Sequence, residues 1–131
     1  MAWSLTDVTT KNAVLTQINN ALGTAAKISW QNASSVELAT TSLYAAGNPF
    51  ATPASGQMLL VSAAGSTTTP LQLTSTNFTA AGVTKLVFQT SGATPIFNGV
   101  VASPTGGDMN CDALPVAGQA LRTDSLTMTV N

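Results

Sequence analysis

The sequence has very few charged residues, and it has no histidine. Four residues are Lys or Arg and five are Asp or Glu, so charged residues make up 7% of the 131 positions, against about a quarter in an ordinary soluble domain. Most of the side chains that perform acid–base, nucleophilic or metal chemistry are therefore missing. A surface rich in uncharged Thr, Ser, Asn and Gln also costs little to desolvate against another protein, because few ions lose their water. We expect a structural protein that packs in an assembly, and not an enzyme.

Several classes of partner and compartment are disfavoured by what the chain lacks. Its net charge is −1 and its four cations are scattered, whereas a phosphate backbone requires clustered Lys and Arg, so nucleic acid is not expected as a partner. The longest run of bulky apolar residues extends only from Met58 to Val61, far short of the ~20 residues that span a membrane. The start shows no basic and then apolar signal segment, and the single Cys111 forms no intrachain disulfide. These features fit assembly in a reducing cytoplasm.

Large side chains that could anchor a core are also scarce, with two Trp, four Phe and one Tyr. A chain of this length is the usual size of one domain and buries about two-thirds of its surface on folding. The thin core and uncharged surface favour oligomerisation as a source of stability. The alternative is a monomer whose many Thr residues serve strand propensity. No change in composition divides the chain, so we predict one β-rich domain over 1–131, with an N-terminal arm and helix in 1–23 and a β-domain in 24–131.

One amphipathic helix is predicted over residues 7–22. Thr6 or Asp7 can cap its start, and Gly23 stands where a left-handed residue commonly ends a helix. The apolar residues recur at spacings of seven, three and four, which places them in one stripe: Val8, Leu15, Ile18 and Leu22.

After Gly23 the apolar period becomes two, which is typical of β-strands. Residues 27–31 and 35–40 alternate on either side of a turn at 32–34, and this pattern predicts a β-hairpin. Gly, Pro, Ser and Asn punctuate the rest of the chain, and between them we expect strands at 57–62, 70–74, 84–90, 95–102 and 119–130. Many short strands at regular spacing predict a mainly β fold, an antiparallel β-sandwich or jelly-roll-like domain with one N-terminal α-helix.

A cluster of polar residues near the C-terminus has part of the spacing of a calcium-binding loop. Asp108, Asn110 and Asp112 stand at the first, third and fifth positions of such a loop. However, Ala113 replaces the glycine of the sixth position, and Gln119 replaces the glutamate of the twelfth. A polar turn whose side chains cap backbone N–H groups is the favoured interpretation, and an ion site at Asp108 is the weaker alternative. We therefore predict no metal and no cofactor.

Cys111 lies in the same cluster but lacks the surroundings of a nucleophile. A reactive thiolate requires a base or a positive neighbour, and the chain contains no histidine to provide one. We expect Met109, Cys111 and Leu114 to face the interior as apolar side chains. No catalytic residue is predicted.

Several short segments resemble a family of small virion proteins of tailed phages. The resemblance is carried at the N-terminus by Leu5-Thr6-Asp7 through Asn12-Ala13, and in the C-terminal third by Phe97-Asn98-Gly99-Val100-Val101, Gly107-Asp108-Met109-Asn110-Cys111-Asp112, Ala117-Gly118-Gln119-Ala120-Leu121 and Ser125 to Val130. The chain departs from the family pattern at Cys111, where an aliphatic residue is expected. The resemblance implies a β-rich decoration or cement subunit on the capsid exterior, working as a dimer or trimer.

The leading hypothesis from these observations is a capsid decoration protein whose partner is the major capsid protein. The candidate partner-contact residues are Trp3 and Leu5 in the N-terminal arm and Tyr44 and Phe50 in the 43–53 loop. Two of them have a competing interpretation. Trp3 could instead pack on its own helix, and Phe50 could turn inward and anchor its loop. The alternative functions are a phage tail or adaptor subunit, and a β-sandwich module that binds carbohydrate or a host surface through Trp3, Trp30 or Tyr44.

Overall fold

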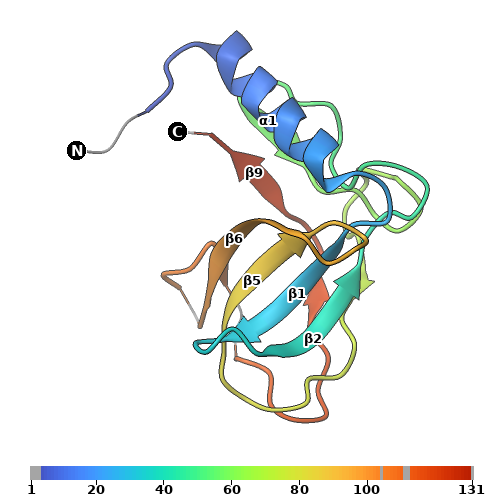
Figure 1. Cartoon of the computed structure of the whole chain (residues 1–131), viewed down its shortest axis with the longest axis vertical. Helices are drawn as coiled ribbons and strands as arrows, with labels where there is room; N and C mark the ends of the chain where they lie inside the picture. The colour runs from blue at the N-terminus through green and yellow to red at the C-terminus, as the bar shows by residue number, and fades with distance from the viewer. Residues whose placement is uncertain (1–3, 104, 111–112, 131) are drawn as a thin grey trace.

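A five-stranded sheet forms the centre of the computed structural model, which describes residues 4–103, 105–110 and 113–130 (Figure 1). Its strand order is β2-β1-β5-β6-β7, and all pairs are antiparallel except β6 with β7. The strands of this sheet are β1 (Lys27–Asn32), β2 (Glu37–Ser42), β5 (Val83–Gln89), β6 (Pro95–Ala102) and β7 (Met109–Asn110).

Two antiparallel pairs of short strands and one helix complete the described elements. They are β3 (Gln57–Leu59) with β9 (Thr127–Thr129), β4 (Leu73–Thr74) with β8 (Arg122–Thr123), and α1 (Val8–Leu22). The chain is thus mainly β with antiparallel sheets and a single N-terminal helix, which confirms the predicted fold class.

The helix α1 begins and ends where the sequence predicts. The Asp7 carboxylate accepts a hydrogen bond from the Thr10 N–H at 2.9 Å, and Gly23 closes the last turn with a φ of 69°. Leu15 and Leu22 are buried as the apolar stripe requires. The prediction is wrong for Val8, which is 50% exposed, because the first turn of α1 lies at the end of the helix farther from the sheet (Figure 1).

The predicted hairpin is confirmed as β1 and β2, which pair from Lys27 with Ser42 onward. The turn is longer than predicted because the Asn32 side chain organises it. The Asn32 carboxamide oxygen accepts hydrogen bonds from the backbone N–H groups of Ser34 and Val36, at 2.9 and 3.0 Å. These bonds hold residues 32–36 in a turn, so β2 starts at Glu37 and not at residue 35.

The predicted strand at 119–130 is two separate strands, β8 and β9. The Asp124 carbonyl accepts a hydrogen bond from the Leu71 N–H, whereas the Leu126 carbonyl accepts one from the Leu60 N–H. The chain therefore changes its partner from the 70s segment to β3 between these two residues. Residues 95–102 form β6 as predicted, and the strands expected at 57–62 and 70–74 are shorter, as β3 and β4.

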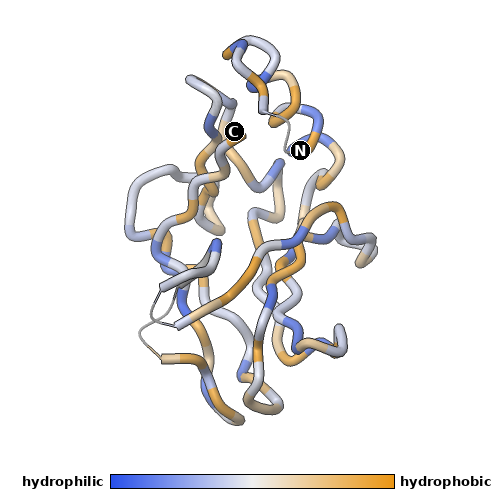
Figure 2. Tube along the Cα trace, turned by 90° about the vertical axis from the view of Figure 1, so that its left-hand side faces the viewer, coloured by the Kyte–Doolittle hydropathy of each residue, from blue (hydrophilic) through white to orange (hydrophobic). Residues whose placement is uncertain are grey.

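The core is built around a few aromatic side chains. Trp30 is fully buried and its indole N–H donates to the Thr41 hydroxyl at 2.9 Å. The Phe88 ring packs between the rings of Phe50 and Phe97, with centroid distances of 5.5 and 4.4 Å. Strongly hydrophilic stretches are short and scattered along the whole trace (Figure 2), as the low charge of the sequence requires.

Candidate functional site

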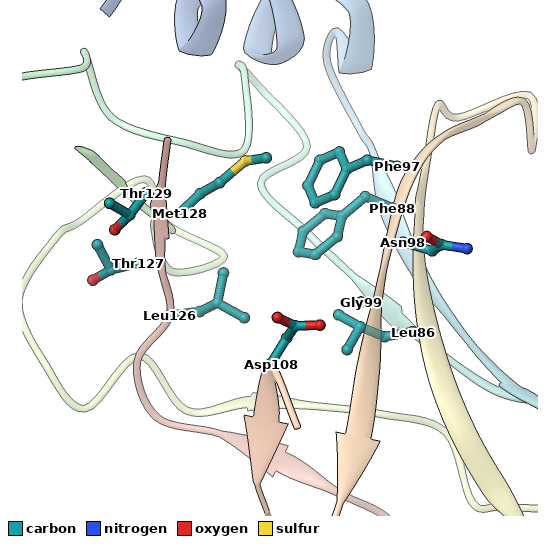
Figure 3. Close-up of a pocket in the computed structure, with 10 residues that line it drawn as sticks. All are labelled: Leu86, Phe88, Phe97, Asn98, Gly99, Asp108, Leu126, Thr127, Met128 and Thr129. Atoms are coloured by element: carbon teal, nitrogen blue, oxygen red, sulfur yellow. The ribbon is translucent and has the colours of Figure 1, made fainter. Parts of the chain in front are cut away.

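One hollow of the described surface is a groove between β6 and β9, with a volume of about 240 Å³. Its apolar lining comes from both sides of the gap (Figure 3): Leu86, Phe88 and Phe97 from β5 and β6, and Leu126 and Met128 from the last strand and the residue before it. Asn98, Gly99, Asp108, Thr127 and Thr129 form the remainder of its lining.

One side of the groove is an open edge of β6. The Val100 N–H donates to the Asp108 carboxylate at 2.7 Å, so it points away from β5. Because backbone groups alternate in direction along a strand, the N–H and C=O of Asn98 point to the same side. β7 pairs with β6 only at Val101 and Ala102. The first half of this edge therefore pairs with no other described strand.

The opposite side is an open edge of β9. The Leu126 carbonyl and the Val130 N–H bond to the β3 side, to Leu60 and Gly56 respectively. By the same alternation the N–H and C=O groups of Thr127 and Thr129 point away from β3, toward β6. No described strand pairs with β9 on this side. The groove is thus a gap of unpaired backbone between two strands.

Asp108 closes one end of the groove and has a structural role there. Its carboxylate bonds to the Val100 N–H, and Gly99 leaves the space that it occupies, since a Cβ at position 99 would lie 3.2 Å from the Asp108 Cβ. The carboxylate thus caps a backbone N–H group, as predicted for the cluster, but this group belongs to β6 and not to the turn itself. Asp112 lies outside the described residues, and among those described no group of three His, Cys, Asp or Glu side chains is placed to hold a metal ion.

Two of the candidate contact residues, Tyr44 and Phe50, line one hollow of about 460 Å³. Leu5 is half-buried before α1 and Trp3 lies outside the described residues. Tyr44 is half-buried, and its ring lies so close to Gly47 and Gly65 that a Cβ on either glycine would be within 2.8 Å of it. The structure corrects the contact prediction for Phe50, which is 3% exposed and packs in the core. Its competing interpretation as an anchor of the loop is confirmed.

The prediction of an interior Leu114 is also wrong, because this side chain is 37% exposed. Cys111, which was expected to share that environment, lies outside the described residues, and the side chain of Met109 is not described.

Most charged side chains that the structure describes are bonded within the chain. Glu37 accepts from Ser29 at 2.6 Å, Lys85 donates to Ser35 at 2.6 Å, and Arg122 pairs with Asp124 at 2.8 Å. Asp7 and Asp108 accept from backbone N–H groups, as described above.

The hydrogen bonds of the Asp7 cap also affect the titration of this carboxyl group. Its hydrogen bonds from the Thr10 hydroxyl and the Thr10 N–H lower the pKa of the carboxyl.

No helix in the described part of the chain is long and apolar enough to cross a bilayer.

No protein-family model, curated protein or solved structure matches this chain.

The groove itself was not predicted from the sequence. The alternation over residues 126–130 indicates a strand, but it carries no information on which of the two edges of that strand finds a partner.

Proposed function

We propose that this chain is a structural virion protein, a decoration subunit that binds the outer capsid surface of a tailed phage. It acts as a homo-oligomer and stabilises the contacts between major capsid proteins. The observation that carries the proposal is the nature of the surface, which has few charges and engages most of those described in bonds within the chain. Such a surface loses little hydration when it is buried against another protein.

Exposed apolar residues on several faces support the same function. Charged residues are depleted at the centres of protein interfaces, and apolar residues replace them there. The large hydrophobic side chains that the structure leaves exposed lie on α1, on the hairpin turn, on β3 and β6 and in the 113–116 segment: Val8, Val14, Val36, Leu59, Val100, Leu114 and Val116.

Three of the five segments that resemble phage virion proteins lie next to one another. Phe97 and Gly99, Asp108 and Met128 come from these three segments and line one groove.

A carbohydrate-binding module has less support. Its site requires aromatic rings on the surface, and Trp30, one of the three aromatic residues considered for that role, is fully buried. The tail or adaptor alternative differs from the main proposal only in the place of binding, so microscopy of the particle distinguishes the two.

The test is reconstitution on phage heads that lack this protein. We expect the purified chain to sediment with such heads, to saturate at a fixed number of copies, and to raise the temperature at which the heads release DNA. Electron microscopy is expected to place it on the outer capsid surface. Absence from the heads, or density confined to the tail, would contradict the proposal.

Single substitutions to Asp on separate exposed faces identify the contacting surface. Val14→Asp, Val36→Asp and Val116→Asp each place a charge on a different segment that is already exposed, so folding is expected to be unaffected. At least one of them is expected to weaken head binding by tenfold or more, because the new charge loses its water in the contact. A tenfold loss corresponds to about 1.4 kcal/mol.

A further inference from the structure

The groove between β6 and β9 has the features of a site for an added β-strand. The backbone N–H and C=O groups of Asn98, Thr127 and Thr129 face it from opposite sides and pair with no described strand. Open strand edges are templates for pairing with another chain, and an extended peptide that joins such an edge gains main-chain hydrogen bonds. Here a single peptide has two such edges available.

Between these edges, apolar side chains form part of the lining of the groove. Phe88 and Phe97 stack on one side and Leu126 and Met128 point toward them from the other (Figure 3). The volume of about 240 Å³ exceeds the ~150 Å³ of an engineered protein cavity that holds benzene. The hollow is therefore large enough in volume for one aromatic ring. An added strand would direct alternate side chains into it and the others to solvent.

The N-terminal arm of this chain has the sequence that such a groove selects. Met1, Trp3 and Leu5 are bulky and apolar, whereas Ala2, Ser4 and Thr6 between them are small or polar. Residues 1–6 carry no charged side chain, and the one charged side chain of the groove, Asp108, already bonds to Val100. We propose that the groove accepts the arm, residues 1–6, of a second copy of this chain as an added strand.

The described part of the arm is accessible to a second copy. Residues 4–7 leave the start of α1 at the edge of the molecule (Figure 1), and Ser4 and Thr6 are exposed. The arm and the groove are different surfaces of the chain. All arms and grooves are therefore occupied when two copies each place the arm in the groove of the other, or when three copies do so around a ring. The expected mass is two or three times 13.2 kDa.

This inference shares only the homo-oligomer with the proposed function, and it needs no capsid. It is tested on the purified chain alone, so a failure here leaves the result on phage heads unaffected. A failure on phage heads likewise leaves the arm exchange intact.

Disulfide trapping between two differently labelled chains tests the contact directly. In a Cys111→Ser background, Ser4→Cys is placed in one chain, and Asn98→Cys, Thr127→Cys or Thr129→Cys in the other. In an added strand these side chains share the outer face, where neighbouring Cβ atoms lie about 4.5–5.5 Å apart. The matched control is Thr16→Cys on the exposed face of α1.

The expected result is a disulfide between the two kinds of chain for at least one groove position and none for Thr16→Cys. No crosslink at the three groove positions, or an equal crosslink at Thr16→Cys, would overturn the inference. A chain that carries both the arm and the groove cysteine, remains at 13.2 kDa and closes the disulfide internally would show that the arm fills its own groove, which also overturns it.

The mass measured by light scattering provides a second test, which compares substitutions at inward and outward positions of the arm. Trp3→Ser and Leu5→Ser remove side chains expected to enter the groove, and each is expected to shift the chain toward the monomer. Ser4→Ala changes the neighbouring outward position and is expected to leave the mass unchanged. Since all three lie before α1, circular dichroism should show the same fold for each. An unchanged oligomer in Trp3→Ser and Leu5→Ser would overturn the inference.

Discussion

The side-chain amide of Asn19 makes two hydrogen bonds with the backbone of Phe50. Its nitrogen donates to the Phe50 carbonyl at 2.8 Å, and its oxygen accepts from the Phe50 N–H at 3.1 Å. Both residues are buried. One side-chain amide thus satisfies both backbone groups of Phe50, as a neighbouring strand would. Because the Phe50 ring contacts the Phe88 ring, these bonds also attach α1 to the core.

We expect Asn19→Ala to destabilise the fold strongly. It leaves a buried N–H and a buried C=O of Phe50 without partners, and each stranded group costs about 1–3 kcal/mol, so the free energy of unfolding should fall by about 3 kcal/mol. Urea unfolding measures it. The matched control is Asn20→Ala, whose side chain makes an exposed bond with Asn48 and whose loss should stay within about 0.5 kcal/mol. Equal effects of the two variants would contradict the role assigned to Asn19.

The same substitution at two buried threonines should change stability in opposite directions. The Thr123 hydroxyl is buried without a hydrogen-bond partner among the described residues, so Thr123→Val should raise the free energy of unfolding by about 1 kcal/mol, because it removes a desolvated polar group. The Thr41 hydroxyl accepts from the Trp30 indole. Thr41→Val should lower stability by about 1–3 kcal/mol. Thermal unfolding of both variants decides the sign, and a loss in Thr123→Val would show that its hydroxyl is satisfied.

Gly47→Ala should displace the Tyr44 ring. A Cβ at position 47 would lie 2.7 Å from Cε2 of Tyr44, and overpacking of this kind costs about 1–3 kcal/mol. In a Tyr44→Leu background the same substitution should cost much less, which a double-mutant cycle in urea measures. Gly92→Ala is the control, since the nearest atom to its new Cβ lies 3.9 Å away. Additive effects at positions 44 and 47 would exclude the ring contact as the cause.

The Asp7 cap should make helix stability depend on pH in the acid range. Bonds from Thr10 lower the pKa of this carboxyl below its ordinary value of 3.8. A group whose pKa is lower in the folded state stabilises the fold above the unfolded value, and this stabilisation is lost as the pH falls through the folded value. Asp7→Asn should therefore have a flatter stability profile than the native chain between about pH 5 and about pH 2. Parallel profiles of the two proteins would contradict the prediction.

The elements predicted from the sequence are those whose signal is local. The cap at Asp7, the stripe through Leu15 and Leu22 and the positions of β1, β5 and β6 follow from the types of consecutive residues, and the structure confirms them. Phe50 shows the limit of this reasoning. The sequence leaves open whether this residue is a partner contact or an anchor of its loop, because the bonds that fix it in the core come from Asn19, 31 positions away.

The groove was beyond sequence reasoning for the same reason. It exists because β9 pairs with β3 on one side only and because Asp108 ends the open edge of β6. Both are relations between distant segments, and neither changes the pattern of any one strand. β7 was missed because two residues are too few to show a period.

The engagement of charges within the chain has a consequence for how this protein responds to its medium. Dissolved salt weakens attraction between exposed ions and leaves apolar and backbone contacts largely untouched. An association that buries this surface should therefore depend little on the concentration of salt.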